Sequence, residues 1–241
     1  MQISSAVVLV TGANRGLGLA LVKQALARGA QRVYAGARRT ASLEAAVRLD
    51  PARVVPLELD VTQPASVTAA AKVASDVSFL INNAGVLASY DVLDSAEEQL
   101  RADMEVNYFG PLRLARAFQA ALARAPQAGL LNVLSVVSLA SMPALGGYSA
   151  SKAAAHSLTQ SLRGQLGKHG VQVFAAFPGP IDTEMIRSFD MAKTSPEEVA
   201  TAIFEGVLAD QSEIFPDAAS RGIGAVWRAS PLELARQFAA G

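Results

Sequence analysis

An apolar run followed by a glycine turn constrains the fold of this chain more than any other feature. In VVLVTGANRGLGLAL (residues 7–21), a β-branched run leads into Gly12, Gly16 and Gly18, and a helical pattern follows. Glycines allow a tight turn and a close approach of the backbone to a pyrophosphate, and N–H groups at a helix start face such an anion. A P-loop is excluded because Leu19, and not Lys followed by Ser or Thr, comes after Gly18. The stretch predicts a strand, a turn and a helix that hold a pyrophosphate.

Short apolar runs alternate with longer helical patterns along the rest of the chain. The runs are mostly continuous, as expected for parallel strands that are covered on both faces. This pattern predicts an α/β fold in which a doubly wound parallel sheet of about seven strands carries helices on both faces, formed by one domain over residues 1–241. The predicted strands are residues 6–11, 32–37, 53–59, 77–82, 130–135, 171–177 and 212–216.

Several helix ends can be read from the sequence. Gly29 is predicted to close the first helix, since glycine commonly ends helices. The segments SAEE (95–98) and SPEE (195–198) have the form of capping boxes, in which Ser precedes the helix and Glu stands three residues later. Each is predicted to begin a helix.

Charge and composition exclude several classes of function. Basic and acidic side chains number 21 each, and a net charge of zero argues against nucleic acid or an anionic membrane as the main partner. The chain has no cysteine and two histidines, which removes thiolate and His-rich metal sites. Residues 125–151 are uncharged, but their prolines and glycines fit a buried strand and loop better than a membrane span. No basic residue precedes the first apolar run, so we expect a cytoplasmic protein without a secretory signal.

The end of the second predicted strand bears on the choice of nucleotide. An acid about 20 residues beyond the glycine turn would bind the ribose 2′-OH of NAD, but the sequence there is AGARR, with Arg38 and Arg39 and no acid. Arg15, inside the glycine turn, can reach the same place. Two guanidinium groups facing one ribose suit a 2′-phosphate, so NADP(H) is predicted in preference to NAD(H). The alternative is that these arginines are solvated surface side chains.

The segment YSASKAAA (148–155) places Tyr148 and Lys152 one helical turn apart, so that the phenol and the ammonium share a helix face. The same letters spell S-x-x-K from Ser149 to Lys152, the start of an acyl-transfer motif. That motif also requires S-D-N and K-T-G elements, which the sequence lacks. The Tyr–Lys pair is therefore the favoured interpretation.

Four motifs make the chain similar to the short-chain dehydrogenase/reductase family. They are TGANRGLG, NNAG (82–85), YSASK and PGPIDTEM (178–185), in the order and spacing of that family. The resemblance covers about residues 6–216. It implies a Rossmann-type fold and nicotinamide-dependent oxidation or reduction at a carbonyl or alcohol carbon, and the glycine turn looks especially like that of NADPH-dependent carbonyl reductases.

The resemblance implies that Tyr148 is the acid/base and that Lys152 activates it. A free phenol has a pKa near ~10, and a nearby ammonium together with a positive nicotinamide would lower this value. The family's substrate-binding serine stands 13 positions before the tyrosine, which is Ser135 here, with Ser138 as the alternative. Ser135 also ends a predicted strand, at the carboxyl edge where α/β proteins bind ligands.

Asn107 matches the fourth catalytic position of the family. Pro111 stands four residues later and has no N–H, so the carbonyl of Asn107 loses its helical partner and the helix should kink. We expect that carbonyl to hold a water between itself and Lys152, as part of a proton path to solvent. The alternative is a kink that serves packing alone.

The resemblance also implies a set of cofactor contacts. Asp60 and Val61 would lie near the adenine, residues 83–85 near the adenosine ribose, and the segment after 178 near the nicotinamide. The predicted cofactor-binding residues are Gly12, Asn14, Arg15, Gly16, Leu17, Gly18, Arg38, Asp60, Val61, Asn83, Ala84, Gly85, Tyr148, Lys152, Pro178, Gly179, Ile181 and Thr183.

The expected partner is a small carbonyl or alcohol substrate. The presumed pocket segments 86–90, 136–147 and 184–193 are mostly apolar, which favours an apolar ketone, aldehyde or secondary alcohol. Residues 184–194 are expected to form a short lid. The resemblance implies a homodimer or homotetramer, although the tail 217–241 departs from the usual family ending. The alternative function is an NADP(H)-binding sensor of the same fold with little catalysis.

Overall fold

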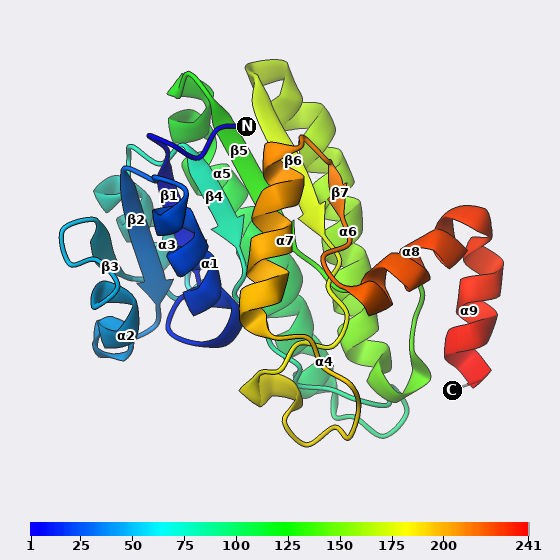
Figure 1. Cartoon of the computed structure of the whole chain (residues 1–241). Helices are drawn as coiled ribbons and strands as arrows, with labels where there is room; N and C mark the ends of the chain where they lie inside the picture. The colour runs from blue at the N-terminus through cyan, green and yellow to red at the C-terminus, as the bar shows by residue number, and fades with distance from the viewer. Residues whose placement is uncertain (241) are drawn as a thin grey trace.

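Seven parallel strands form one sheet in the computed structural model, which describes residues 1–240 (Figure 1). Their order is β3-β2-β1-β4-β5-β6-β7. The chain thus builds outward from β1 to one edge and then from β4 to the other, which is the doubly wound Rossmann-type arrangement. The strands are β1 (Val7–Thr11), β2 (Arg32–Ala37), β3 (Val54–Glu58), β4 (Phe79–Asn82), β5 (Ala128–Val133), β6 (Val171–Ala176) and β7 (Glu213–Ile214).

The apolar runs become strands because both faces of the sheet are covered. Leu9 and Val10 in β1, and Leu80 and Ile81 in β4, point to opposite faces, and all four are fully buried. Every predicted strand is confirmed to within about two residues at its ends, and β7 is the shortest.

Helices cover both faces of this sheet. In Figure 1, α1 and α7 lie together in front of the sheet, and α3, α5 and α6 lie behind it. Each layer has its own apolar core against the sheet. The helices are α1 (Gly16–Ala27), α2 (Glu44–Val47), α3 (Pro64–Val73), α4 (Glu97–Met104), α5 (Gly110–Arg124), α6 (Gly146–Leu166), α7 (Pro196–Leu208), α8 (Ala218–Ala229) and α9 (Pro231–Ala240).

All three predicted helix ends lie within about two residues of the observed ones, and one of the two predicted capping boxes is confirmed. Gly29 has φ +82° just beyond α1, and Ser195 and Glu198 form a reciprocal capping box at the start of α7. The box predicted at 95–98 is wrong, because the hydroxyl of Ser95 accepts a hydrogen bond from the N–H of Tyr90 instead. Helix α4 consequently begins at Glu97, after Ala96.

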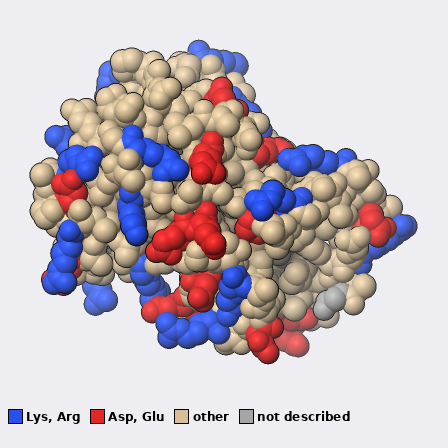
Figure 2. Space-filling view, in the orientation of Figure 1, with Lys and Arg blue, Asp and Glu red and all other residues tan. Residues whose placement is uncertain are grey.

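The predicted tail forms α8 and α9, which lie beyond β7 at the right of Figure 1. The tail prediction included Gly241, which lies outside the described residues. In the described part of the chain, no helix is both long and apolar enough to cross a membrane. On the face drawn in Figure 2, basic and acidic side chains are interspersed.

Candidate active site

The predicted site residues converge on the carboxyl edge of the sheet, where β1, β4, β5 and β6 end side by side. The chain leaves β1 into the glycine turn, β4 into residues 83–90, β5 towards Ser135 and β6 towards Pro178. The strand order reverses between β1 and β4, and doubly wound sheets bind their ligands at such a switch point. The four motifs of the sequence therefore lie around one place.

The glycine turn has backbone geometry that few other residues could adopt. Gly12 and Gly16 have φ +66° and +52°. A Cβ atom on Gly18 would lie 2.7 Å from Asn83 Nδ2 and still closer to the carbonyl oxygen of Gly12. The turn is therefore packed tightly from behind by α1 and residue 83, and the first turn of α1 supplies N–H groups for an anion.

The segment after β4 supports this turn. Thr11 Oγ1 accepts hydrogen bonds from the N–H groups of Asn83 and Ala84, at 3.0 and 2.9 Å. Asn83 Nδ2 donates to the carbonyl of Thr11 at 2.9 Å, so its side chain holds the turn in place. A Cβ on Gly85 would lie 3.6 Å from Lys152 Nζ, so this segment also leads towards the Tyr–Lys pair.

Tyr148 and Lys152 share a face of α6, as predicted. Lys152 Nζ lies 5.7 Å from the centre of the Tyr148 ring and donates to the carbonyl of Val133 at 3.0 Å. Burial lowers the pKa of Lys152 to about 8, and the carboxylate of Asp103 opposes this shift. The Lys152 ammonium is thus a stronger acid than that of an ordinary lysine.

The pKa of the Tyr148 phenol is set mainly by burial of the side chain. Burial, reinforced by the negative charge of Asp103, raises the pKa of Tyr148 above its ordinary value. The expected lowering of this pKa by the Lys152 ammonium together with a positive nicotinamide stays a prediction. In the chain itself burial penalises the phenolate, and Lys152 is bonded to Val133. A phenol that stays protonated at neutral pH is suited to donating a proton.

The three serines near the site are distinguished by their hydrogen bonds. Ser138 is buried, and its hydroxyl accepts from the N–H of Ser135 at 3.1 Å, so it caps the short 3₁₀ helix Val136–Ser138. Ser149 is also buried and accepts from the N–H of Met142 at 3.3 Å. Ser135 Oγ accepts from the N–H of Val137 at 3.4 Å as the N-cap of that 3₁₀ helix, but Ser135 is only half-buried, which makes its hydroxyl the most exposed of the three.

Asn107 lies in the expected distortion between α4 and α5. A π-helical turn spans Glu105–Phe109, and the N–H of Gly110 donates to the carbonyl of Glu105. The side chain of Asn107 is buried and donates to Ser151 Oγ at 2.9 Å. The helix is distorted here because Pro111 has no N–H to donate to the carbonyl of Asn107. The side-chain amide of Asn107 links this turn to α6 through its hydrogen bond to Ser151.

The residues predicted to contact the adenosine half of the cofactor divide into three groups. Arg15 forms an ion pair with Glu184, and Arg38 is exposed. Asp60 Oδ1 accepts from both the N–H and the hydroxyl of Thr62, at 3.0 and 2.7 Å. The remaining members belong to the core or the turn itself: the buried Leu17 and Val61, and the half-buried Asn14.

The loop after β6 is fixed by a residue that the sequence analysis did not single out. The buried carboxylate of Asp217 accepts from the N–H of Gly179 at 2.9 Å and from the N–H of Ser220 at 2.8 Å. Pro178 accepts from the N–H of Val136 at 3.1 Å. The start of α8 therefore braces the predicted nicotinamide loop. The only sequence signal was that Asp217 precedes a helix, which is typical of a capping residue.

The whole motif-bearing region also matches a known protein family. The model of the family described as short chain dehydrogenase matches residues 6–194. The chain belongs to this family.

Other short chain dehydrogenases resemble it over most of its length. The short chain dehydrogenase pigC of Monascus ruber is 32% identical over 198 residues, which are 77% of this chain and 65% of that protein. A short chain dehydrogenase from Burkholderia cenocepacia, solved in complex with NADP, is 39% identical with a TM-score of 0.92, and the match covers 99% of each chain. A family member from Burkholderia phymatum, solved in complex with NAD, is 25% identical with a TM-score of 0.83, covering 97% of this chain and 96% of that one.

The segment expected to be a lid in this short chain dehydrogenase is held at its base and at its tip. Thr194 donates to the carbonyl of Pro180 and accepts from the N–H of Asp182, both at 2.9 Å. At the tip, the Phe189 ring stacks on Tyr90 with 6.3 Å between ring centres. The segment 184–194 therefore lies against the loop 86–90, and both were predicted to line the substrate pocket.

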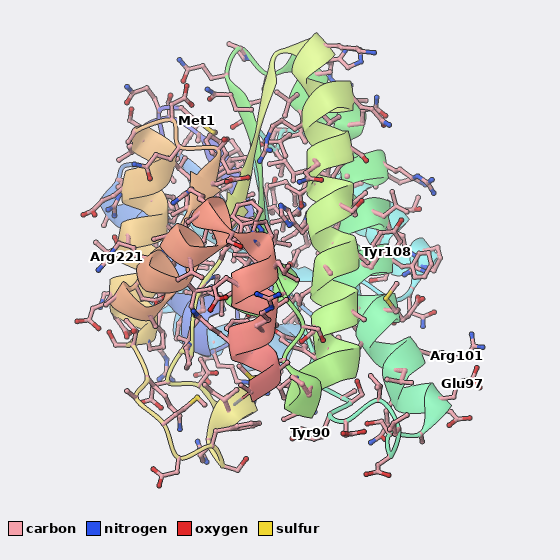
Figure 3. All side chains as sticks on the ribbon, turned by 90° about the vertical axis from the view of Figure 1, so that its right-hand side faces the viewer. Met1, Tyr90, Glu97, Arg101, Tyr108 and Arg221 are labelled. Carbon is pink, nitrogen blue, oxygen red and sulfur yellow. The ribbon has the colours of Figure 1, made fainter. Side chains whose placement is uncertain are left out.

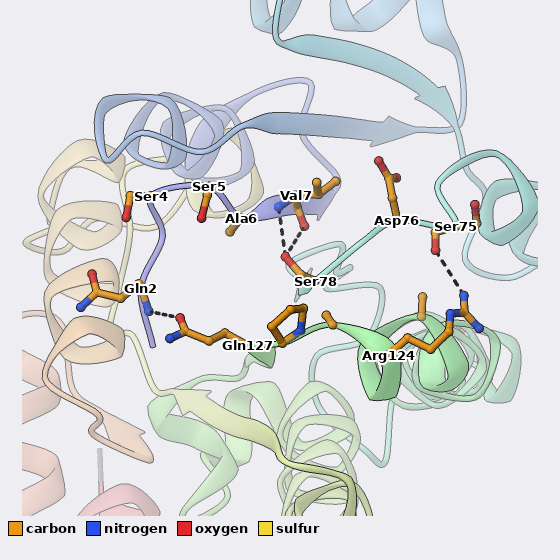
Figure 4. A pocket seen from close by; sticks show the side chains of 13 residues that line it. Gln2, Ser4, Ser5, Ala6, Val7, Ser75, Asp76, Ser78, Arg124 and Gln127 are labelled. Atoms are coloured by element: carbon orange, nitrogen blue, oxygen red, sulfur yellow. Dashed lines mark hydrogen bonds between the residues drawn. The ribbon is translucent and has the colours of Figure 1, made fainter.

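A hollow of about 640 Å³ lies at the opposite, amino edge of the sheet (Figure 4). Gln2 bonds to Gln127, Val7 to Ser78 and Arg124 to Ser75 along its rim. None of the predicted site residues lines it. Within residues 1–240, no cluster of acids and histidines is suited to hold a metal ion.

Proposed function

We propose that this short chain dehydrogenase is an NADP(H)-dependent oxidoreductase that interconverts a ketone or aldehyde and an alcohol. The observation that carries the proposal is the pairing of Tyr148 and Lys152 on one face of α6, which packs against the segment following Ser135. An acid/base, a cation and an available hydroxyl thus lie at the same sheet edge as the glycine turn. This combination suits hydride transfer coupled to proton transfer.

The chain's own geometry fits a dinucleotide. A Cβ on Gly16 would lie 3.1 Å from Thr183 Cγ2, so the glycine turn and the loop after β6 face each other closely. NADP(H), when bound, supplies or accepts a hydride at its nicotinamide ring. The solved relatives named above hold NADP in one case and NAD in the other. The exposed Arg38, with no acid beside it, supports NADP(H) for this chain.

In the reducing direction, Tyr148 donates its phenolic proton to the carbonyl oxygen of the substrate. The hydroxyl of Ser135 donates a hydrogen bond to the same oxygen and stabilises the negative charge that develops there. Lys152, whose pKa is lowered by burial, then gives a proton to the phenolate of Tyr148. In the oxidising direction each proton moves the other way.

Replacing Arg38 by Ala should weaken NADPH binding by about 10- to 100-fold, because a charge-assisted contact contributes about 1.5–3 kcal/mol. NADH has no 2′-phosphate, so its affinity should stay within about twofold of the original. Dissociation constants from fluorescence titration measure both. Arg48→Ala is the matched control, since Arg48 is exposed and paired with Glu44. Equal losses for NADPH and NADH would contradict the 2′-phosphate assignment.

Replacing Pro111 by Ala should slow turnover about threefold and alter the pH–rate profile. The new N–H gives the carbonyl of Asn107 a helical partner, so that the carbonyl no longer serves the proposed water path to Lys152. Steady-state rates in H₂O and D₂O across the pH range measure this. Pro231→Ala, at the start of α9, is the control. A pH–rate profile identical to that of the original protein would remove the relay from the mechanism.

The function itself is tested by mixing the purified protein, NADPH and a panel of ketones and aldehydes and following the absorbance of NADPH. We expect turnover to be best with apolar substrates, because Tyr90, Val92, Met185 and Met191 are large apolar side chains exposed in and beside the loop 86–90 and the lid. NADPH binding without turnover on any carbonyl compound would instead favour a sensor. Dimer or tetramer formation stays a prediction.

A further inference from the structure

The loop 86–90 is fastened by two side chains from one stretch of helix. Asn107 Oδ1 accepts from the N–H of Val86 at 3.0 Å, and Asn107 Nδ2 donates to the carbonyl of Val86 at 2.9 Å. Four residues earlier, Asp103 Oδ1 accepts from the N–H of Ala88 at 2.9 Å, and its Oδ2 accepts from the N–H of Ser89 at 3.1 Å. The hydroxyl of Ser89 also donates to Asp103. These hydrogen bonds from Asn107 and Asp103 hold the loop 86–90 near both of its ends.

Asp103 is an unusual residue to find at this position. It is fully buried, and the three donors that satisfy its carboxylate are two N–H groups and a hydroxyl, all neutral. Burying a carboxylate is costly unless its oxygens are fully hydrogen-bonded. The carboxyl group of Asp103 is thus held by neutral donors from the loop 86–90.

The loop connects Asp103 to the start of the helix that carries Tyr148. The N–H of Gly147 donates to the carbonyl of Tyr90 at 3.4 Å, and Tyr90 lies at the lower end of α6 in Figure 3. A Cβ on Gly147 would lie 3.1 Å from Ser89 Cβ and closer still to its Oγ. Ser89 is therefore pressed between Asp103 and the residue directly before Tyr148.

The charge of Asp103 also acts on the two groups of the proposed proton transfer. It raises the pKa of Lys152 and that of Tyr148. His156, one turn further along α6, is the next titratable side chain on this helix, and burial lowers its pKa, with smaller effects from Glu213 and Arg163. Asp103 is thus the one charge, within residues 1–240, that shifts both Tyr148 and Lys152.

We propose that Asp103 is a positioning residue: its carboxylate fixes the substrate loop 86–90 against the start of α6, the helix that carries Tyr148 and Lys152. An electrostatic effect on those two side chains is expected to accompany this positioning. The proposal rests on the function proposed above, in which those two side chains transfer the proton. The loop 86–90 is predicted to line the substrate pocket, so its position should affect substrate binding more than NADPH binding.

The electrostatic part is tested without any turnover. In protein labelled with ¹³C at lysine Cε, the Lys152 resonance is assigned by its loss in Lys152→Met and followed against pH. Removing the carboxylate in Asp103→Asn should lower the titration midpoint of Lys152, because Asp103 raises the pKa of Lys152 against the effect of burial. Ser89→Ala keeps the carboxylate, and Glu98→Gln removes an exposed carboxylate from the same helix; both should leave the midpoint unchanged.

The positioning part is tested by hydrogen exchange and kinetics. Amide exchange of residues 86–90 should accelerate in both Asp103→Asn and Ser89→Ala. With a substrate found by the carbonyl screen, both variants should raise the KM for that substrate about three- to tenfold while the KM for NADPH stays within twofold. The Glu98→Gln variant should match the original protein in every measurement.

Two results would overturn the proposal: an unchanged Lys152 midpoint in folded Asp103→Asn, or unchanged loop exchange in Ser89→Ala. If Asp103→Asn does not fold, Ser89→Ala still decides the positioning part. A protein that turns over no carbonyl compound contradicts the proposed function instead, and the lysine titration and the loop exchange remain measurable in that case.

Discussion

Tyr148→Phe should lose about 10²- to 10⁴-fold in turnover while binding NADPH with nearly the original affinity. The range is that of a positioned general acid, and the substitution removes the only proton that the ring can give. The Phe ring occupies the same half-buried space, and Lys152 still bonds to Val133. Carbonyl-dependent oxidation of NADPH measures turnover, and fluorescence titration measures affinity.

The pH dependence adds a second check on the same substitution. Because burial and Asp103 raise the pKa of Tyr148, the phenol is protonated at neutral pH and ready for reduction. Alcohol oxidation needs the phenolate, so its rate should rise with pH above neutral and should lose this dependence in Tyr148→Phe. Tyr108→Phe is the control, because Tyr108 points away from the sheet in Figure 3 and packs on Phe109. Turnover within tenfold of the original in Tyr148→Phe would remove Tyr148 from the acid/base role.

The fold was predictable because each element carries its own local signal. Strands such as β1 and β4 are covered on both faces, and this burial appears in the sequence as an unbroken apolar run. Strand ends depend on neighbours that the sequence does not reveal. Strand β5 begins at Ala128, two residues before the predicted start, because its pairing with β6 begins there opposite Val171.

The capping box predicted at 95–98 shows how tertiary contacts override a local pattern. Ser95 and Glu98 have the right spacing, but Ser95 Oγ is taken by the N–H of Tyr90. The side chain of Gln99 accepts from the N–H of Ala96 instead, and the helix begins one residue later. A sequence window of four residues cannot show that competition.

The site residues were predictable as positions but not as contacts. The motifs located Asn83 and Arg15, yet the side chain of Asn83 supports the glycine turn, and Arg15 pairs with Glu184, 169 positions away. Asp103 and Asp217 were missed for the same reason. Each is a buried carboxylate that accepts from the N–H of a loop elsewhere in the sequence, Ala88 for Asp103 and Gly179 for Asp217, and a lone Asp is usually a solvated side chain.

Gly18→Ala should abolish measurable NADPH binding at concentrations that saturate the original protein. A Cβ at this position would lie 2.7 Å from Asn83 Nδ2 and 2.8 Å from the carbonyl carbon of Gly12. The Gly12 carbonyl belongs to the turn itself, and it cannot move without changing the positive φ of Gly12 and the N–H groups that face the pyrophosphate. The clash should also lower the free energy of unfolding by about 1–3 kcal/mol.

Gly164→Ala separates the effect of the turn from that of the substitution. Gly164 lies inside α6, and a Cβ on it would meet no atom within 4 Å. Alanine there should raise the free energy of unfolding by about 0.5–1 kcal/mol, since it is the better helix former, and should leave NADPH binding unchanged. Denaturant unfolding and NADPH titration of both variants give the comparison. If Gly18→Ala bound NADPH as tightly as Gly164→Ala does, the close approach of α1 to the turn would not be what shapes the cofactor site.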